Sequence, residues 1–307
     1  MFVALFSELL YTYMPSLKAV KSRIATVKST QQITRAMKMV AASKLRKAQG
    51  RLLQMRPYAD KLNQILNNVS ANLSEKNISI YAQEREVKNV LIVIYTSDRG
   101  LCGAFNANIY RYLRQYISNK YPTHHKEGRL QIMTVGTKGR DYYKNKDQRL
   151  ITDHAELFSE QTFSNVREAA EDAMEMFASG KIDRVELVYN TFKNVATQVV
   201  TNEQFLPVQT EEEEDATKTS IEYIYEPSEE YIVEELIPQS LKIQFYKAYL
   251  ESAASEQGAR MTAMDQATEN AGELLSELKL TYNRTRQAAI TKEILEIVGG
   301  ANALENS

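Results

Sequence analysis

Residues 275–298 read LSELKLTYNRTRQAAITKEILEIV, and no proline occurs anywhere after Pro238. Apolar side chains recur here at intervals of three and four residues, the period of one helix face. The 60 residues from Gln239 to Val298 predict a single helix, about 90 Å long at roughly 1.5 Å per residue. Gly299 and Gly300 follow and predict its end. Such a helix needs a partner to cover its apolar stripe, because the usual globular helix has only about 11 or 12 residues.

The partner is expected at the other end of the chain. Ser16 suits a helix N-cap after Pro15, no proline follows until Pro57, and a helical pattern then resumes. Both segments carry partial heptads in which Gln, Thr and Ala stand where Leu would pack better. The heptad positions are Ile24, Val27, Gln31, Thr34, Met37 and Val40, and in the other segment Leu275, Leu278, Tyr282, Thr285, Ala289, Ile290, Ile294 and Ile297. The two ends are therefore predicted to pair as an antiparallel coiled coil.

The middle of the chain alternates between strand and helix patterns. Val90–Tyr95 (VLIVIY) is a continuous apolar run, typical of a strand buried on both faces. Further strands are predicted at 130–135 and 184–191, an edge strand at 221–225, and helices at 106–118, after Gly139 and at 164–179. This alternation predicts a parallel, doubly wound, Rossmann-like sheet.

The predicted fold class is thus α/β with long helices, an antiparallel coiled coil plus a Rossmann-like domain. The expected divisions are 1–14 (an N-terminal extension, disordered or not native), 15–75 (first coiled-coil helix), 76–237 (Rossmann-like domain) and 238–307 (second coiled-coil helix). Met1–Tyr13 lacks the features of a secretory signal or transit peptide, and translation is expected to start at Met14. No apolar run approaches the 18 to 20 residues, roughly, of a membrane span. The single cysteine, Cys102, fits a reducing compartment.

The net charge of −1 hides a strong segregation of charge. Residues 16–56 hold eleven of the 38 basic residues and no acidic one, so all 39 acidic residues lie elsewhere. Three interpretations stay open: a solvated helix face, a nucleic-acid-binding surface, and a surface for an acidic protein partner. Like charges four residues apart destabilise a helix, which argues against the first. The apolar heptads lie within the basic stretch, which is unlike a basic zipper and argues against the second.

No pattern of catalytic or metal-binding residues is found. Ser97–Phe105 (SDRGLCGAF) follows a strand, where Rossmann-type domains bind phosphates. It lacks the G-x-G-x-x-G spacing and no G-K-[ST] follows, so a structural turn is favoured over a phosphate cradle, as it is for 136–139. Cys102 has no histidine in a suitable pattern. No cofactor or metal is therefore predicted, and a redox or nucleotide enzyme using the α/β domain stays a rival.

Three motifs, in order, resemble those of F-type ATP synthase gamma subunits. They are ITRAMKMVAASK at 33–44, SDRGLCG at 97–103 and LTYNRTRQAAITKEILEIVGGA at 280–301, and the match runs from about Ser16 to Leu304. The resemblance implies the central rotating shaft of a proton-translocating synthase, with no catalytic activity of its own. The resemblance implies that its coiled coil lies inside the ring of alpha and beta subunits. It also implies that the Rossmann-like domain projects toward the membrane and binds no nucleotide. The shaft would couple rotation of the c ring to the conformational cycle of the catalytic beta subunits.

The resemblance also implies partners: the alpha, beta and epsilon subunits and the c ring, with delta as a further candidate, and no nucleic acid. The expected contact residues are Arg35, Met37 and Lys38 for acidic loops of beta, Arg286, Gln287 and Thr291 for the beta catch region, and Tyr223, Tyr225 and Glu226 for the c ring and epsilon. The lack of an extra cysteine pair and of a transit peptide favours a bacterial protein, peripheral at the cytoplasmic face of the plasma (inner) membrane. The alternative function is a basic coiled-coil nucleic-acid-binding protein.

Overall fold

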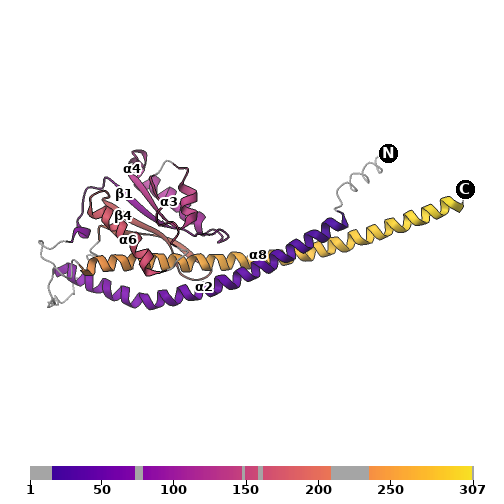
Figure 1. Cartoon of the computed structure of the whole chain (residues 1–307), viewed down its shortest axis with the longest axis horizontal. Coiled ribbons are helices and arrows are strands. Elements are labelled where there is room, and N and C mark those ends of the chain that lie inside the picture. Colours follow the sequence, from indigo (N-terminus) through magenta and orange to yellow (C-terminus); the bar gives the residue numbers. More distant parts are fainter. Residues whose placement is uncertain (1–15, 73–78, 147–148, 158–161, 209–234, 306–307) are drawn as a thin grey trace. The chain divides into compact units, whose positions relative to one another are not determined.

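The computed structural model describes residues 16–72, 79–146, 149–157, 162–208 and 235–305. These belong to two compact units: the sheet unit, from Val40 to Ala263, and the helical unit, formed by the residues before Val40 and after Ala263. Two long helices, α2 (Leu17–Asn72) and α8 (Ile237–Glu305), contribute to both units (Figure 1). The predicted edge strand at 221–225 and the N-terminal extension lie outside the described residues. The domain limits given above stay predictions.

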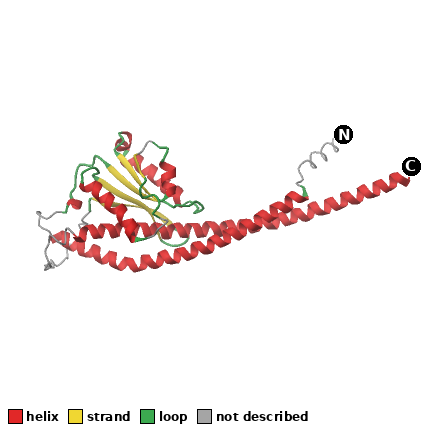
Figure 2. Ribbon diagram, in the orientation of Figure 1, coloured by secondary structure: helices red, strands yellow, loops and turns green. Residues whose placement is uncertain are grey.

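The sheet unit is built on five strands in the order β3-β2-β1-β4-β5. They are β1 (Val90–Tyr95), β2 (Leu130–Val135), β3 (Arg149–Ile151), β4 (Arg184–Phe192) and β5 (Gln198–Leu206). The helical elements are η2 (Ile80–Ala82), α3 (Phe105–Lys120), α4 (Pro122–Lys126), α5 (Thr137–Tyr143) and α6 (Phe163–Ala178). Figure 2 shows the strands in yellow and the helices in red. The first four strands are parallel, as predicted, but β5 runs antiparallel to β4, so a wholly parallel sheet was wrong.

Strand β1 is apolar along its whole length because both of its faces are covered. Leu91, Val93 and Tyr95 belong to a core cluster with residues of α6 and α8. Ile92 and Ile94 belong to a second cluster with residues of α3. Successive side chains of a strand point to opposite faces, so a strand between two layers must be apolar at every position.

Helix α8 forms part of this core. All residues from 248 to 259 are buried. Ala254 clusters with Leu45 of α2, and Ile243 clusters with Leu62. As residue numbers increase along α2, those of the contacting residues on α8 decrease. The two helices therefore run antiparallel within the sheet unit.

The same helices also pair in the helical unit. Gln31 Nε2 donates to Thr268 O (3.4 Å), and Thr268 Oγ1 donates to Thr34 Oγ1 (2.8 Å). Lys38 Nζ lies 2.5 Å from Asp265 Oδ1. Here too, residues further along α2 contact residues earlier in α8, which confirms the predicted antiparallel pairing.

The helix ends and the seam differ in detail from the prediction. Ser16 Oγ accepts from Ala19 N–H (3.2 Å), which confirms the N-cap. Helix α8 does not stop at Gly299 and Gly300 but continues to Glu305. Neither glycine has a positive φ, and a glycine inside a helix costs only about 1 kcal/mol relative to alanine. Val40 is 57% exposed, and its neighbour Ala41 is buried in the seam instead, because a helix of 3.6 residues per turn drifts from a strict heptad.

Candidate functional site

The turn after β1 is held by its own side chains. Ser97 N–H donates to Asn106 Oδ1 (3.0 Å), and Asn106 Nδ2 donates to Ser97 Oγ (2.7 Å). Ser97 Oγ donates in turn to Arg99 O (2.9 Å). Leu101 and Gly103 have positive φ of 64° and 58°, the left-handed conformation that a tight turn requires. The SDRGLCG motif therefore folds back on the start of α3.

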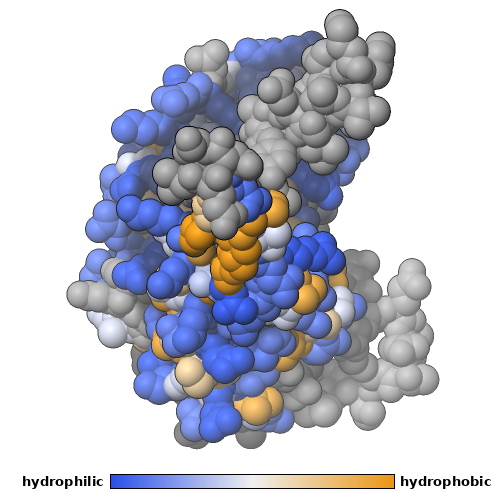
Figure 3. Space-filling view, turned by 90° about the vertical axis from the view of Figure 1, so that its right-hand side faces the viewer, coloured by the Kyte–Doolittle hydropathy of each residue, from blue (hydrophilic) through white to orange (hydrophobic). Residues whose placement is uncertain are grey.

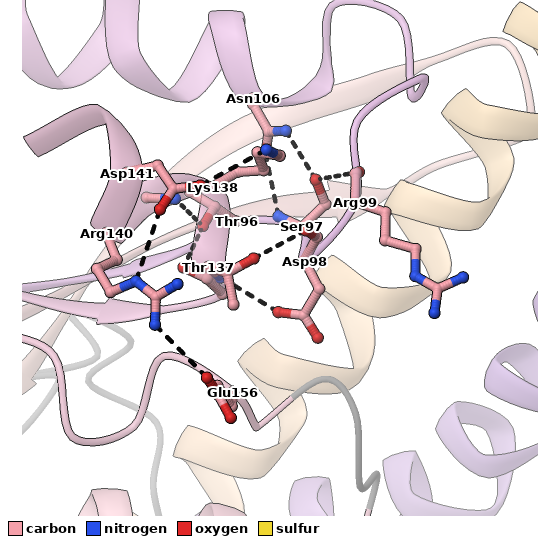
Figure 4. A network of polar contacts seen from close by, with 12 residues as sticks. Thr96, Ser97, Asp98, Arg99, Asn106, Thr137, Lys138, Arg140, Asp141 and Glu156 are labelled. Atoms are coloured by element: carbon pink, nitrogen blue, oxygen red, sulfur yellow. Dashed lines mark hydrogen bonds and ion pairs between the residues drawn. The ribbon is translucent and has the colours of Figure 1, made fainter.

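A second turn, after β2, is bonded to the first (Figure 4). Thr137 N–H donates to Asp98 Oδ1 (3.1 Å), and its hydroxyl donates to Asp98 O (2.8 Å). Lys138 N–H donates to Ser97 O (3.0 Å). A phosphate cradle needs several free backbone N–H groups directed at the anion. Here the N–H groups of Ser97, Thr137 and Lys138 already have partners within the chain, which supports the structural-turn interpretation.

Two glycines allow the turns to approach this closely. Gly136 has φ 112°, and a Cβ at this position would lie 2.0 Å from Thr96 O. Gly139 N–H donates to Thr96 Oγ1 (2.8 Å), and a Cβ on Gly139 would also lie 2.8 Å from that oxygen. Gly136 and Gly139 thus allow the turn after β2 to pack closely against Thr96 at the end of β1.

Asp98 and Cys102 are the acidic groups of the turn after β1. Burial raises the pKa of the Asp98 carboxyl, partly offset by the hydrogen bond from Thr137. Burial also raises the pKa of the Cys102 thiol, whose polar neighbours are Ser97, Asn106 and a backbone carbonyl. A reactive cysteine needs a lowered pKa or an adjacent base. Across the described ranges, no group of His, Cys, Asp and Glu is placed to hold a metal ion.

Helix α8 is fastened to the turn after β1 by one arginine. Arg260 Nη2 donates to Arg99 O (2.8 Å) and to Gly100 O (3.2 Å). The Arg260 guanidinium also forms an ion pair with Glu256, one helical turn earlier. Burial raises the pKa of the Glu256 carboxyl, while Arg260 acts in the opposite direction.

The same helix is fastened to strands β1 and β4. Ser255 Oγ donates to Asn190 O (2.8 Å), and Glu251 Oε2 accepts from Phe192 N–H (2.9 Å). Ser252 Oγ donates to Tyr95 O (3.5 Å). We call Glu251, Ser252, Ser255, Glu256 and Arg260 the α8 clamp. No local sequence pattern indicates the clamp, because its partners lie about 60 to 160 positions away along the chain.

The partner residues predicted on α2 lie in the helical unit. Arg35 is exposed and Met37 is half-buried. Lys38 already has a carboxylate partner in Asp265 of α8, although both side chains stay largely accessible, at 38% and 60%. Part of the positive charge of α2 is therefore balanced within the chain, which the sequence reading had not anticipated.

The partner residues predicted on α8 are exposed. Arg286, Gln287 and Thr291 face solvent, and Thr291 Oγ1 donates to Gln287 O (2.9 Å). The third predicted group, Tyr223, Tyr225 and Glu226, lies outside the described residues. The assignment of all nine residues to partner contacts stays a prediction.

The end of α8 displays an apolar stripe. Its residues, all about half exposed or more, are Ile290, Ile294, Leu295, Ile297 and Val298. The predicted place of Ile290, Ile294 and Ile297 in the seam is wrong, since no described residue of α2 covers them. Figure 3, from the side toward which this end of α8 points, shows hydrophobic surface in orange among hydrophilic surface. Exposed apolar surface of this kind marks an interaction site.

Fold and surface together define a class of protein. The chain is an assembly subunit with paired long helices, one of which displays apolar and basic groups and is clamped to an α/β sheet. The ATP synthase family model matches residues 16–304. The ATP synthase gamma chain of Cytophaga hutchinsonii is 55% identical over 295 residues, covering 95% of this chain and 100% of that protein. That of Christiangramia forsetii is 52% identical over 291 residues, covering 95% and 99%.

The chain therefore belongs to the ATP synthase gamma family, whose members are non-catalytic subunits of the central stalk. It is also similar to a chain of the Tetrahymena thermophila mitochondrial ATP synthase central stalk and c-ring, with TM-score 0.55 and 27% identity over 76% of this chain and 99% of that one. A chain of the Euglena gracilis mitochondrial enzyme (OSCP, F1 and c-ring) has TM-score 0.63 and 23% identity, covering 94% of each, and shows the same fold. Among the described helices, none is both long and apolar enough to span a membrane.

Proposed function

We propose that this chain is the rotating shaft of a bacterial, proton-translocating ATP synthase, coupling c-ring rotation to the conformational cycle of the catalytic beta subunits. Its proposed neighbours are the alpha, beta and epsilon subunits and the c ring, with delta as a further candidate. It is held peripherally at the cytoplasmic face of the plasma membrane through the complex. The similar Euglena chain belongs to an assembly with F1 and a c-ring, which supports these partners.

One observation carries the proposal: the two different surfaces of helix α8. A shaft must receive torque at one place and deliver it at another through a stiff element. Residues 251–259 are buried, and the α8 clamp bonds this part of the helix to strand ends and to the turn after β1. Residues 286–302 are exposed and present both charge and the apolar stripe. A continuous helix with a clamped part and a displayed part has the properties that torque transmission requires.

Magnitudes decide how the torque is borne. Moving one charge across 100 mV supplies about 2.3 kcal/mol, whereas one exposed ion pair contributes only about 0 to 1 kcal/mol. No single salt bridge can therefore carry a catalytic step. Steric contact with the apolar stripe and many distributed charges on α2 must therefore share the load.

Co-purification tests the proposal. A tagged chain expressed in place of the native one should bring down catalytic alpha and beta subunits in excess over itself, since one shaft serves a whole ring. A tagged chain ending after Leu278, which lacks the apolar stripe, should recover far less of the ring. Recovery of the full chain alone, or with nucleic acid that nuclease treatment releases, would reject the shaft role.

A further inference from the structure

The sheet unit carries a second basic region, which contains none of the residues predicted for partner contacts. Residues 105–146 contain nine Lys and Arg, six Tyr and only two acidic residues, in a chain whose net charge is −1. Both acids already have cationic partners. Glu127 pairs with Arg129, and Asp141 lies 3.5 Å from Lys138. Two further cations, Lys120 and Arg140, pair with Glu186 and Glu156 outside this range. The region still carries an excess of positive charge.

A hollow of about 130 Å³ lies within this region, between α3 and α5. The Tyr110 and Tyr142 rings stack along it, with centroids 3.9 Å apart and planes 2° from parallel. Tyr143 stands edge-on to Tyr110, with centroids 5.9 Å apart. Arg114 Nη2 donates to Tyr142 OH (2.8 Å), and Lys146 Nζ lies 3.4 Å from the centroid of the Tyr142 ring. Two cations and three tyrosines thus line one small cavity.

The charge in this hollow has no internal counterpart among the described residues. None of those lining it is acidic, and neither Arg114 nor Lys146 forms an ion pair with a described carboxylate. The hydrogen bond from Lys146 lowers the pKa of the Tyr142 hydroxyl, against a weaker effect of burial, and Arg114 lowers it further. Because Tyr142 OH accepts from Arg114, its own proton can be donated to a ligand. Two cations and a hydroxyl donor are the complement of a carboxylate.

We propose that this hollow is a docking site for an acidic segment of another protein, with one Asp or Glu carboxylate held by Arg114, Lys146 and the Tyr142 hydroxyl. Charge complementarity argues for an acidic partner, and Tyr and Arg are the residues enriched at the centre of protein interfaces. None of the nine residues predicted for partner contacts lines this hollow, so its test does not depend on those assignments.

Size and ring geometry argue against a nucleotide or a nucleic acid. Pockets for drug-sized ligands have volumes of roughly 300 to 1,000 Å³, whereas this hollow is suited to a single side chain. Single-stranded nucleic acids bind by stacking bases on aromatic rings. Tyr110 covers one face of Tyr142 and Lys146 covers the other, so the ring offers no face to a base.

The test is binding of a fluorescein-labelled hexaglutamate peptide to the full chain, followed by fluorescence anisotropy at physiological salt. The double variant Arg114→Gln with Lys146→Gln should weaken binding about tenfold or more, because charge-assisted hydrogen bonds are the strong ones. The matched control, Lys181→Gln with Lys193→Gln, removes the same charge from exposed positions of the sheet unit that do not line the hollow, and should change affinity less than about twofold. Tyr142→Phe keeps every charge and should weaken binding a few-fold, roughly what one lost hydrogen bond contributes.

Circular dichroism confirms that each variant is folded before its affinity is compared. Equal losses in the two double variants would show general charge attraction and overturn the proposal. Equal binding of an uncharged hexaglutamine peptide would show that the hollow does not recognise a carboxylate, and would overturn it too. So would an oligothymidylate that binds more tightly than the peptide and loses more affinity in the Arg114 and Lys146 variant. Displacement of the peptide by millimolar inorganic phosphate would identify a small-anion site and overturn it as well.

Discussion

Gly136 shows how a single residue fixes the contact between two turns. Its φ of 112° is strained for any residue with a Cβ, and that Cβ would lie 2.0 Å from Thr96 O. Gly100, in the turn after β1, has open space around it and no positive φ. The two glycines look alike in the sequence, since each stands in a strand-to-helix turn, and only the backbone geometry separates them.

We therefore expect Gly136→Ala to lower the free energy of unfolding by about 1 to 3 kcal/mol from backbone strain, and further from the clash with Thr96. Gly100→Ala should change it by less than about 0.5 kcal/mol, as is usual at open surface positions. Urea unfolding of both variants measures the difference. Similar stability of the two variants would mean that the turns can separate without cost.

Glu186 is a buried charge that sequence reading did not find. Its side chain is only 2% exposed, and Oε1 accepts from Lys120 Nζ (2.8 Å) and from Tyr121 OH (2.7 Å). Asn202 Nδ2 donates to Oε2 (3.3 Å). Burial raises the pKa of Glu186, but hydrogen bonds, first from Lys120 and then from Tyr121 and Tyr116, outweigh burial, so the pKa lies below its ordinary value.

Lys120→Met should therefore destabilise the chain by about 1 to 3 kcal/mol at pH 7, because a buried carboxylate loses a charged donor. A carboxyl with a lowered folded pKa contributes stability above its unfolded pKa of about 4.3 and loses it as the pH falls through the folded value. The deficit of the variant should thus shrink between pH 5 and pH 3. Unfolding curves across this range measure it, with the exposed Lys126→Met as control. A deficit that stays constant down to pH 3 would contradict the network.

At the level of secondary-structure elements, α8 is distinguished by its bonds to other elements. We expect Arg260→Ala to loosen the turn after β1, because it removes the donor to Arg99 O and Gly100 O. The chain's single cysteine reports this directly, since Cys102 lies in that turn and is 2% exposed. The rate of maleimide labelling should rise about tenfold or more, as loss of a charged hydrogen bond of roughly 1.5 to 3 kcal/mol favours local opening.

The matched control for this experiment is Arg99→Ala. Arg99 takes part in the clamp through its backbone oxygen, and its side chain is exposed. Its truncation should leave the labelling rate near that of the unmodified chain. If both arginine variants were labelled as slowly as the unmodified chain, the clamp would not be what holds the turn.

The elements that could be predicted are those whose burial is encoded locally. Strands β1, β2 and β4 are mostly apolar and largely buried, and their bounds were predicted to within a residue. Strand β5 (QVVTNEQFL) was missed because polar residues on it are satisfied by distant partners, such as Glu203 with Tyr189 OH. β3 has only three residues, too few for any period to show.

The candidate site also has a part that a local sequence pattern predicts and a part that it does not. The basic face of α2 and the apolar positions of α8 follow from helical period, and the resemblance supplied their proposed roles. The clamp and the Glu186 network join residues that are far apart in sequence, such as Ser255 with Asn190. No local pattern distinguishes these serines and glutamates from solvated ones, because their partners are fixed only once the sheet and α8 have packed.

For the whole molecule, the proposed rotation makes a graded prediction about coupling. Lys38→Ala should leave coupled ATP synthesis in inverted membrane vesicles within about twofold, because an exposed ion pair contributes only about 0 to 1 kcal/mol. Ending the chain after Val298 keeps the apolar stripe and should reduce synthesis modestly. Ending it after Leu278 removes the stripe together with Arg286, Gln287 and Thr291, and should reduce synthesis far more. Immunoblots of the beta subunit on each membrane show whether the complex has assembled. Loss of coupled synthesis in an assembled Lys38→Ala complex would mean that one charge carries the torque, and the distributed shaft contact would then be wrong.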